Sequence, residues 1–205
     1  MFNALALISV IAVMLTLRLL VGILPYVLAS AVRWKESINI EASVRLSRDR
    51  DISALVLVIP FCLTVFRFRI YDPMFMSNLT DNVRLLAIIG IFVLYVLLRK
   101  AASMLARPHR IPQKTYAAVI KSANTFFILL TFVLMGAGSI ASFCNASPET
   151  TRSMLLWLSC LIYGLYLIRK VQIFASSYSI FTGFLYLCAL EILPTGIIVV
   201  SGMIF

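Results

Sequence analysis

The 205-residue chain is strongly apolar, with 62% hydrophobic residues, 13% charged residues and a mean hydropathy of +1.02. Ordinary soluble domains are about half apolar and about a quarter charged, so this composition excludes that class. Little polar sequence separates the apolar runs, which leaves no room for a separate soluble domain. The sequence therefore predicts an integral membrane protein, an all-α polytopic bundle that forms one domain over residues 1–205.

Six apolar runs approach or exceed the length of about 20 residues that a helix needs to cross a bilayer. The second and third runs are short, but basic residues at their ends can extend to the interface. The start of the fifth helix is marked by Ser147-Pro148-Glu149, an N-cap residue, a proline at the first helical position and an acid in the first turn. We expect helices over residues 4–31, 52–69, 84–106, 117–144, 154–173 and 179–204.

Basic residues are distributed unevenly between the loops that these helices would leave. The first, third and fifth loops together hold thirteen Lys and Arg, whereas the opposite side holds four. The positive-inside bias then predicts that both termini lie outside. The net charge of +10 points to anionic headgroups of the cytoplasmic leaflet as a partner, and not to nucleic acid. The basic residues expected to face those headgroups are Arg99, Lys100, Arg169 and Lys170.

The sequence contains no recognisable catalytic, cofactor-binding or metal-ligating set. The four cysteines have no metal-ligand spacing, and the single histidine, His109, lies in a basic stretch away from carboxylates. There is no GxSxG, HExxH or phosphate-binding glycine loop. We therefore expect neither an enzyme nor a bound cofactor.

Glu191 lies in the middle of the last apolar run, where an ionised side chain is costly without a partner. Three interpretations are open. The acid is a buried structural group that holds the bundle in register, or it forms a salt bridge with Arg18, the only other charge well inside a predicted span. That bridge would fix the first helix against the sixth or bind a partner subunit. In the third interpretation Glu191 couples transport to a proton or cation, and Pro194 loosens the helix beside it.

Other polar and small residues inside the predicted helices are compatible with each interpretation. Tyr163, Tyr166 and Tyr186 can form hydrogen bonds within the bundle, although tyrosines are also common at membrane interfaces. Gly138 and Ser142 are spaced four residues apart in the fourth helix, a pattern that favours close helix packing.

The C-terminal stretch Tyr186-Leu-Cys188-Ala-Leu-Glu191-Ile-Leu-Pro194 is distinctive. Together with the Leu-Ile-Arg169-Lys170 end of the fifth helix and the six-helix layout, it resembles an uncharacterised bacterial membrane family, domain of unknown function 4271, associated with the Bacteroidetes. The resemblance implies a multi-pass protein of the bacterial inner (cytoplasmic) membrane. It implies no activity, cofactor or catalytic residue.

These observations favour an accessory or assembly subunit that acts through helix packing on a membrane-protein partner, with Arg18 and Glu191 as its buried polar link. The alternative is a small proton- or ion-coupled transporter that uses Glu191. No inverted repeat is evident between the first three and last three helices, so one common mark of a transporter is missing.

Overall fold

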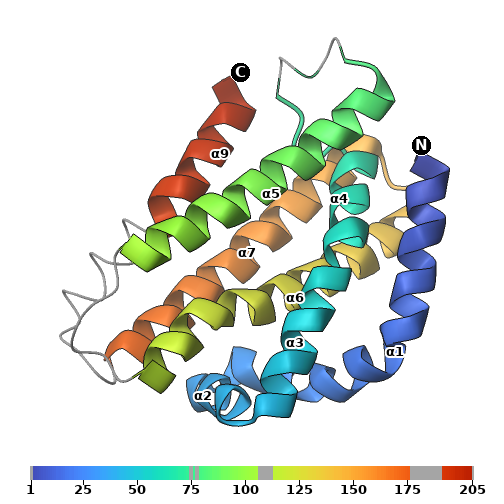
Figure 1. The fold of residues 1–205 in the computed structure, drawn as a ribbon. Coiled ribbons are helices and arrows are strands. Elements are labelled where there is room, and N and C mark those ends of the chain that lie inside the picture. Colours follow the sequence, from blue (N-terminus) through green and yellow to red (C-terminus); the bar gives the residue numbers. More distant parts are fainter. Residues whose placement is uncertain (1, 74–75, 77–78, 106–112, 176–190, 205) are drawn as a thin grey trace.

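The computed structural model describes residues 2–73, 76, 79–105, 113–175 and 191–204, and within them the chain forms helices and no strand (Figure 1). The all-α prediction is therefore confirmed for this part of the chain. The helices are α1 (Phe2–Val32), α2 (Trp34–Ala42), α3 (Val44–Val56), α4 (Val58–Arg67), α5 (Asp81–Leu105), α6 (Gln113–Phe143), α7 (Pro148–Ala175) and α9 (Leu193–Ile204).

Four of the described helices are long and apolar enough to cross a membrane, over Asn3–Val32, Asp81–Ala101, Ala117–Phe143 and Pro148–Ile173. Many of their large apolar side chains point outward: Leu15 on α1 is 81% exposed and Trp157 on α7 is 69% exposed. Such extensive apolar surface suits a hydrocarbon solvent and is rare on soluble monomers. The structure is that of a membrane-embedded helical protein.

Two of the six predicted spans differ from these four helices. The run at 52–69 is divided between the end of α3 and α4, with Leu57 between them. The run at 179–204 is described only from Glu191 onward, and its described helix, α9, has 12 residues. Neither segment reaches the length of the other candidates within the described residues.

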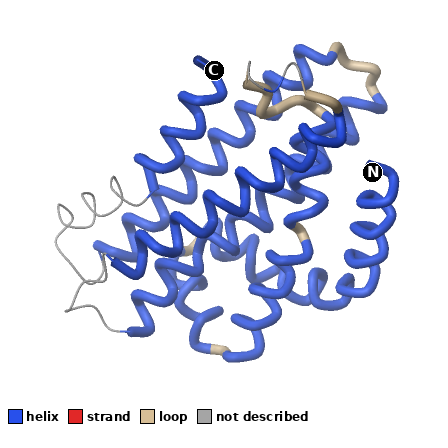
Figure 2. Tube along the Cα trace, turned by 45° about the horizontal axis from the view of Figure 1, so that its top comes forward, coloured by secondary structure: helices blue, strands red, loops and turns tan. Residues whose placement is uncertain are grey.

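The centre of the bundle is α6, which contacts α1, α2, α3, α4 and α7. Figures 1 and 2 show α6 and α7 running along each other, with α5 beside α7 and α9 beside α5. Buried apolar residues from α1, α3 and α6 form one core cluster: Leu20, Ile23, Val27, Ala54, Leu57 and Ile128. A second cluster joins α6 to α7 through Phe126, Ile162 and Tyr166.

The turn between α6 and α7 shows how local sequence fixes the antiparallel packing of these helices. Asn145 adopts a left-handed conformation with φ 50°, and the amide of Ala146 donates to the carbonyl of Ala141 at 3.1 Å, as in a Schellman C-cap. The amide of Thr150 then donates to the Ser147 hydroxyl at 3.2 Å, which confirms Ser147 as the N-cap of α7. Two adjacent caps thus reverse the chain.

Small residues in α6 allow one close approach, as the sequence predicts. A Cβ atom at Gly138 would lie 2.5 Å from Cε2 of Phe68, the residue that ends α4. A Cβ atom at Gly136 would meet nothing within 4 Å. The helix therefore requires a glycine at only one of these two positions, where it packs on the end of α4.

Candidate functional site

The carboxylate of Glu191, two residues before α9, is buried and binds two cations from other helices. Its Oε1 atom accepts hydrogen bonds from Nε of Arg99 at 3.0 Å and from Nη2 of Arg99 at 2.8 Å. The same oxygen accepts from Nζ of Lys170. The side chains of Glu191 and Lys170 are 2% and 3% exposed, and that of Arg99 is 20% exposed. Glu191 therefore ties α9 to α5 and α7.

Tyr166 completes this group, which we call the Glu191 cluster: Arg99, Tyr166, Lys170 and Glu191. The Tyr166 hydroxyl accepts from Nη2 of Arg99 at 2.7 Å and from Nζ of Lys170 at 3.0 Å. Both cations also lie over the Tyr166 ring, at 5.7 Å and 5.4 Å from its centroid. Each cation thus has a carboxylate, a hydroxyl and a π face as partners inside the apolar bundle.

A row of hydroxyls secures the first turn of α9 beside the cluster. Thr195 donates to the carbonyl of Glu191 at 2.7 Å, and the Tyr163 hydroxyl lies 3.1 Å from both that carbonyl and the Thr195 hydroxyl. The Tyr95 hydroxyl is 3.1 Å from Thr195 Oγ1. Pro194 is the second residue of α9, where a missing backbone donor is tolerated. The Tyr95 and Tyr163 hydroxyls come from α5 and α7, as do the two cations.

The charges of the Glu191 cluster do not balance. Two cations face one carboxylate, which gives a formal charge of +1. The second carboxylate oxygen, Oε2, is buried and has no hydrogen-bond partner within the described part of the chain. A buried ion without a counter-charge is strongly destabilising. The stability of the cluster therefore depends most on its single carboxylate.

The cluster lies toward one end of its helices. Arg99 comes 18 residues after Asp81, about 27 Å along α5, and Lys170 comes 22 residues after Pro148, about 33 Å along α7. A hydrocarbon core is about 30 Å thick, so these positions are near the far ends of both spans. Glu191 itself precedes α9 and joins the ends of α5 and α7.

The predicted link between Arg18 and Glu191 is also wrong. Arg18 is exposed on α1, and no side chain in the described residues bonds to it. Hydropathy placed Arg99 and Lys170 at the ends of apolar runs, where they were expected to face headgroups. The structure turns both inward, because a carboxylate buried between α5 and α7 would be strongly destabilising without a cationic partner.

The other basic and tyrosine residues that the sequence singled out are not all part of the Glu191 cluster. Lys100 is exposed. Arg169 donates from Nε to the carbonyl of Ala31 at 2.9 Å and from Nη1 to Gln172 at 2.7 Å, so it joins α7 to the end of α1. Tyr163 and Tyr166 both belong to the site. Tyr186 lies outside the described residues.

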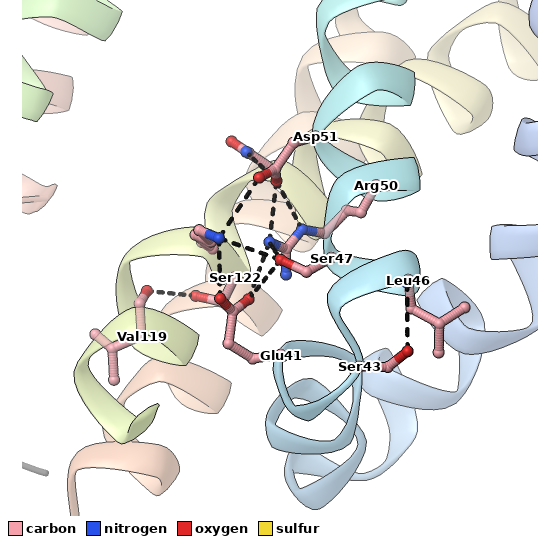
Figure 3. A network of polar contacts seen from close by, with 10 residues as sticks. Glu41, Ser43, Leu46, Ser47, Arg50, Asp51, Val119 and Ser122 are labelled. Atoms are coloured by element: carbon pink, nitrogen blue, oxygen red, sulfur yellow. Dashed lines mark hydrogen bonds and ion pairs between the residues drawn. The ribbon is translucent and has the colours of Figure 1, made fainter. Parts of the chain in front are cut away.

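A second polar network, which the sequence did not predict, joins α2, α3 and α6 (Figure 3). Arg50 is 1% exposed and donates to Oε2 of Glu41 at 3.1 Å and to Oδ1 of Asp51 at 2.9 Å. Lys121 lies 2.9 Å from Oε1 of Glu41, and Asn124 donates to Asp51 at 3.0 Å. We call this the Glu41 network. Its two acids balance its two bases, unlike the Glu191 cluster.

One sequence signal could have revealed the Glu41 network. Lys121 and Asn124 are three residues apart, hence on one face of an otherwise apolar helix. Asp51 immediately precedes the helix expected over 52–69, but α3 begins at Val44, so Asp51 lies one turn or more inside α3. Burial by itself raises the pKa of Glu41, but the ion pairs with Lys121 and Arg50 outweigh burial and hold this pKa below its usual value.

The lowered pKa of Glu41 makes its contribution to stability dependent on pH. Above about pH 4.5, the ordinary value, the carboxylate is ionised in both states and its contribution is complete; it is lost as the pH falls through the lower folded-state pKa. We expect Glu41→Gln to lower the thermal midpoint in detergent at pH 7 and the difference from wild type to shrink below pH 4.5. Glu36→Gln, on the same helix, is the control. A difference that stays constant with pH would contradict this coupling.

The charge excess of the Glu191 cluster predicts unequal effects of two neutralising substitutions. Glu191→Gln leaves two buried cations without a carboxylate and should cost about 3–5 kcal/mol of stability. Lys170→Met leaves one arginine paired with one acid and should cost less than half of that. The double variant should be more stable than Glu191→Gln alone, with chemical denaturation in detergent as the measurement. Equal losses in the two single variants would show that charge balance does not govern the cluster.

The comparisons with known proteins assign the chain to one family. No curated protein and no solved structure matches the chain. The family model described as Domain of unknown function (DUF4271) matches residues 2–201, which is nearly the whole sequence and includes both polar groups described above. The chain therefore belongs to the family Domain of unknown function (DUF4271).

Proposed function

We propose that this protein is an accessory or assembly subunit of a bacterial inner membrane, which acts by packing its helices against another membrane protein and performs no catalysis. The observation that carries this proposal is that the charged groups of the Glu191 cluster bind one another. Its carboxylate and both of its cations are engaged with one another across three helices. Polar groups used in this way favour a role in holding helices together.

Burial of the cluster supports a structural role over a chemical one. A catalytic or carrier carboxylate must be reached by its substrate, whereas the side chain of Glu191 is almost completely covered. Adding a proton to the carboxylate would leave Arg99 and Lys170 as neighbouring buried charges. The arrangement is therefore better suited to keep α9 in one position than to exchange a proton in each cycle.

The surface of the bundle offers large faces for a partner. On α5 the exposed apolar residues recur on one side, and they include Val93, Leu94, Leu97 and Leu98. α9 adds Leu193, Val199 and Val200. A lipid bilayer and a second membrane protein can each cover such faces, since association in membranes depends on close packing and on polar pairs.

Six spanning helices with both termini outside form part of the proposal. The break at Leu57 is small, because its amide donates to Ser53 and its carbonyl accepts from Phe61, so α3 and α4 continue nearly as one helix. α9 starts near the far ends of α5 and α7 and runs back beside α5 (Figure 1). The loops rich in Lys and Arg would then meet anionic cytoplasmic headgroups, with Lys100 exposed toward them.

A small proton- or ion-coupled transporter is the second candidate, and one observation favours it. Oε2 of Glu191 is a buried oxygen without a hydrogen-bond partner in the described residues, and the hydroxyls of Tyr163, Tyr95 and Thr195 adjoin the same turn. An unpartnered carboxylate oxygen beside a row of hydroxyls could accept a transported proton or cation. This candidate requires Glu191 to be released from its partners during each cycle.

The assembly role predicts a stoichiometric partner that depends on α9. We expect tagged wild-type protein, purified from its native membrane in mild detergent, to retain a membrane-protein partner, as identified by mass spectrometry. Glu191→Gln should lose at least half of that partner because α9 is no longer held. Lys170→Met keeps the pair between Glu191 and Arg99 and should retain it. A wild-type protein that purifies without a partner would contradict the assembly role.

Proteoliposomes separate the two candidates. We expect wild-type protein to dissipate an imposed proton gradient, followed with an internal pH-sensitive dye, no faster than protein-free vesicles do. If the wild-type protein and Lys170→Met conduct protons and Glu191→Gln does not, transport through Glu191 replaces the assembly role. The Glu149→Gln variant, which changes an exposed acid in the first turn of α7, controls for reconstitution efficiency.

A further inference from the structure

Arg18 is an exposed charge in the middle of a candidate membrane span. It lies 15 residues after Asn3 and 14 before Val32, so each end of the span is about 21–23 Å away along the helix. Its exposed neighbours on α1 are apolar and include Met14, Leu15 and Val21. The opposite face of α1 is buried in the bundle through Leu20, Ile23 and Val27. Arg18 therefore points away from the described part of the bundle.

Lipid is a poor environment for this guanidinium. Charged residues inside spans usually face the bundle interior, a water-filled cavity or an opposite charge. A long side chain can reach an interface from the last turns of a helix, but Arg18 is several turns from either end of its span. At this position, the Arg18 guanidinium needs a carboxylate within the membrane as its counter-charge.

This chain supplies no such carboxylate. Its sequence has eight acids, all of which fall within the described residues. Five of them pair with other bases: Glu41 and Asp51 in the Glu41 network, Asp49 with Arg45, Asp72 with Arg84, and Glu191 in its cluster. The other three, Glu36, Asp81 and Glu149, lie in the first turns of α2, α5 and α7.

We propose that the outer face of α1 around Arg18 docks a transmembrane helix of a different membrane protein, whose own intramembrane Asp or Glu pairs with Arg18. A second copy of this chain would not satisfy the charge, because its one acid deep among helices, Glu191, is already buried between Arg99 and Lys170. This inference rests on the proposed assembly role and adds the outer face of α1 to the faces of α5 and α9 through which that role works.

The spacing along α1 suits one docked helix. Exposed Ile11, Met14, Arg18 and Gly22 recur at intervals of three or four residues and form a single stripe. A Cβ atom at Gly22 would meet nothing within 4 Å, so the backbone is open one turn from Arg18. A partner helix can approach closely at Gly22 while the planar guanidinium receives its carboxylate in a two-pronged hydrogen bond.

Photocrosslinking in native membranes tests the surface directly. A photoreactive phenylalanine analogue replaces Leu15, beside Arg18, and in a matched control it replaces Trp157 on the exposed face of α7. We expect a protein adduct from position 15 that is absent or at least fivefold weaker from position 157. The crosslinked partner segment should contain an Asp or Glu within a membrane span. Arg18→Glu should reduce the adduct at least fivefold, and reversing the partner's acid to Arg should restore it.

The other outcomes distinguish failure of this inference from failure of the assembly role. Adducts with lipid alone, with a second copy of this chain, or with a span that lacks an acid would overturn docking through Arg18. The same holds if Arg18→Glu leaves the adduct unchanged. A partner that still co-purifies in those cases would preserve the assembly role and place its contact on another face. With neither adduct nor co-purifying partner, both proposals fail.

Discussion

The C-terminal part of the fold depends on the ion pairs that the carboxylate of Glu191 forms. This carboxylate is the counter-ion of Arg99 on α5 and Lys170 on α7, and it lies two residues before α9 begins. Apolar contacts alone position a helix weakly in a bilayer, because lipid tails are as apolar as the side chains they replace. A buried ion cluster has a fixed geometry, so it determines where α9 must sit.

The Glu41 network and the Glu191 cluster differ in charge balance and in exposure. The Glu41 network is charge-balanced, and it joins α2 to α3 and α6. The Glu191 cluster carries a formal charge of +1 and is almost fully covered. Because unpaired charge is costlier in a dry environment, the second group is more sensitive to loss of its acid. Both groups join segments that are distant in sequence.

Arg18 shows the opposite situation, a charge with which none of the eight acids of the chain is paired. All eight acids have positions elsewhere, so the exposed arginine cannot be explained by contacts within one copy. The two charges therefore differ in position. Glu191 joins helices inside the bundle, and Arg18 is exposed on its outer face. An assembly role uses both, since a rigid bundle presents α1 in a defined orientation.

The sequence by itself determined the membrane class, the all-helical architecture and the N-cap of α7 at Ser147. These depend on composition, run length and contacts between near neighbours, which are readable along the chain. It also singled out Glu191, because an acid within an apolar run is unusual. Only the tertiary structure decided the partners of Glu191, since Arg99 and Lys170 are 92 and 21 residues away in the chain. Hydropathy treats a basic residue at the end of a run as interfacial, and only three-dimensional packing shows that a buried carboxylate draws it inward.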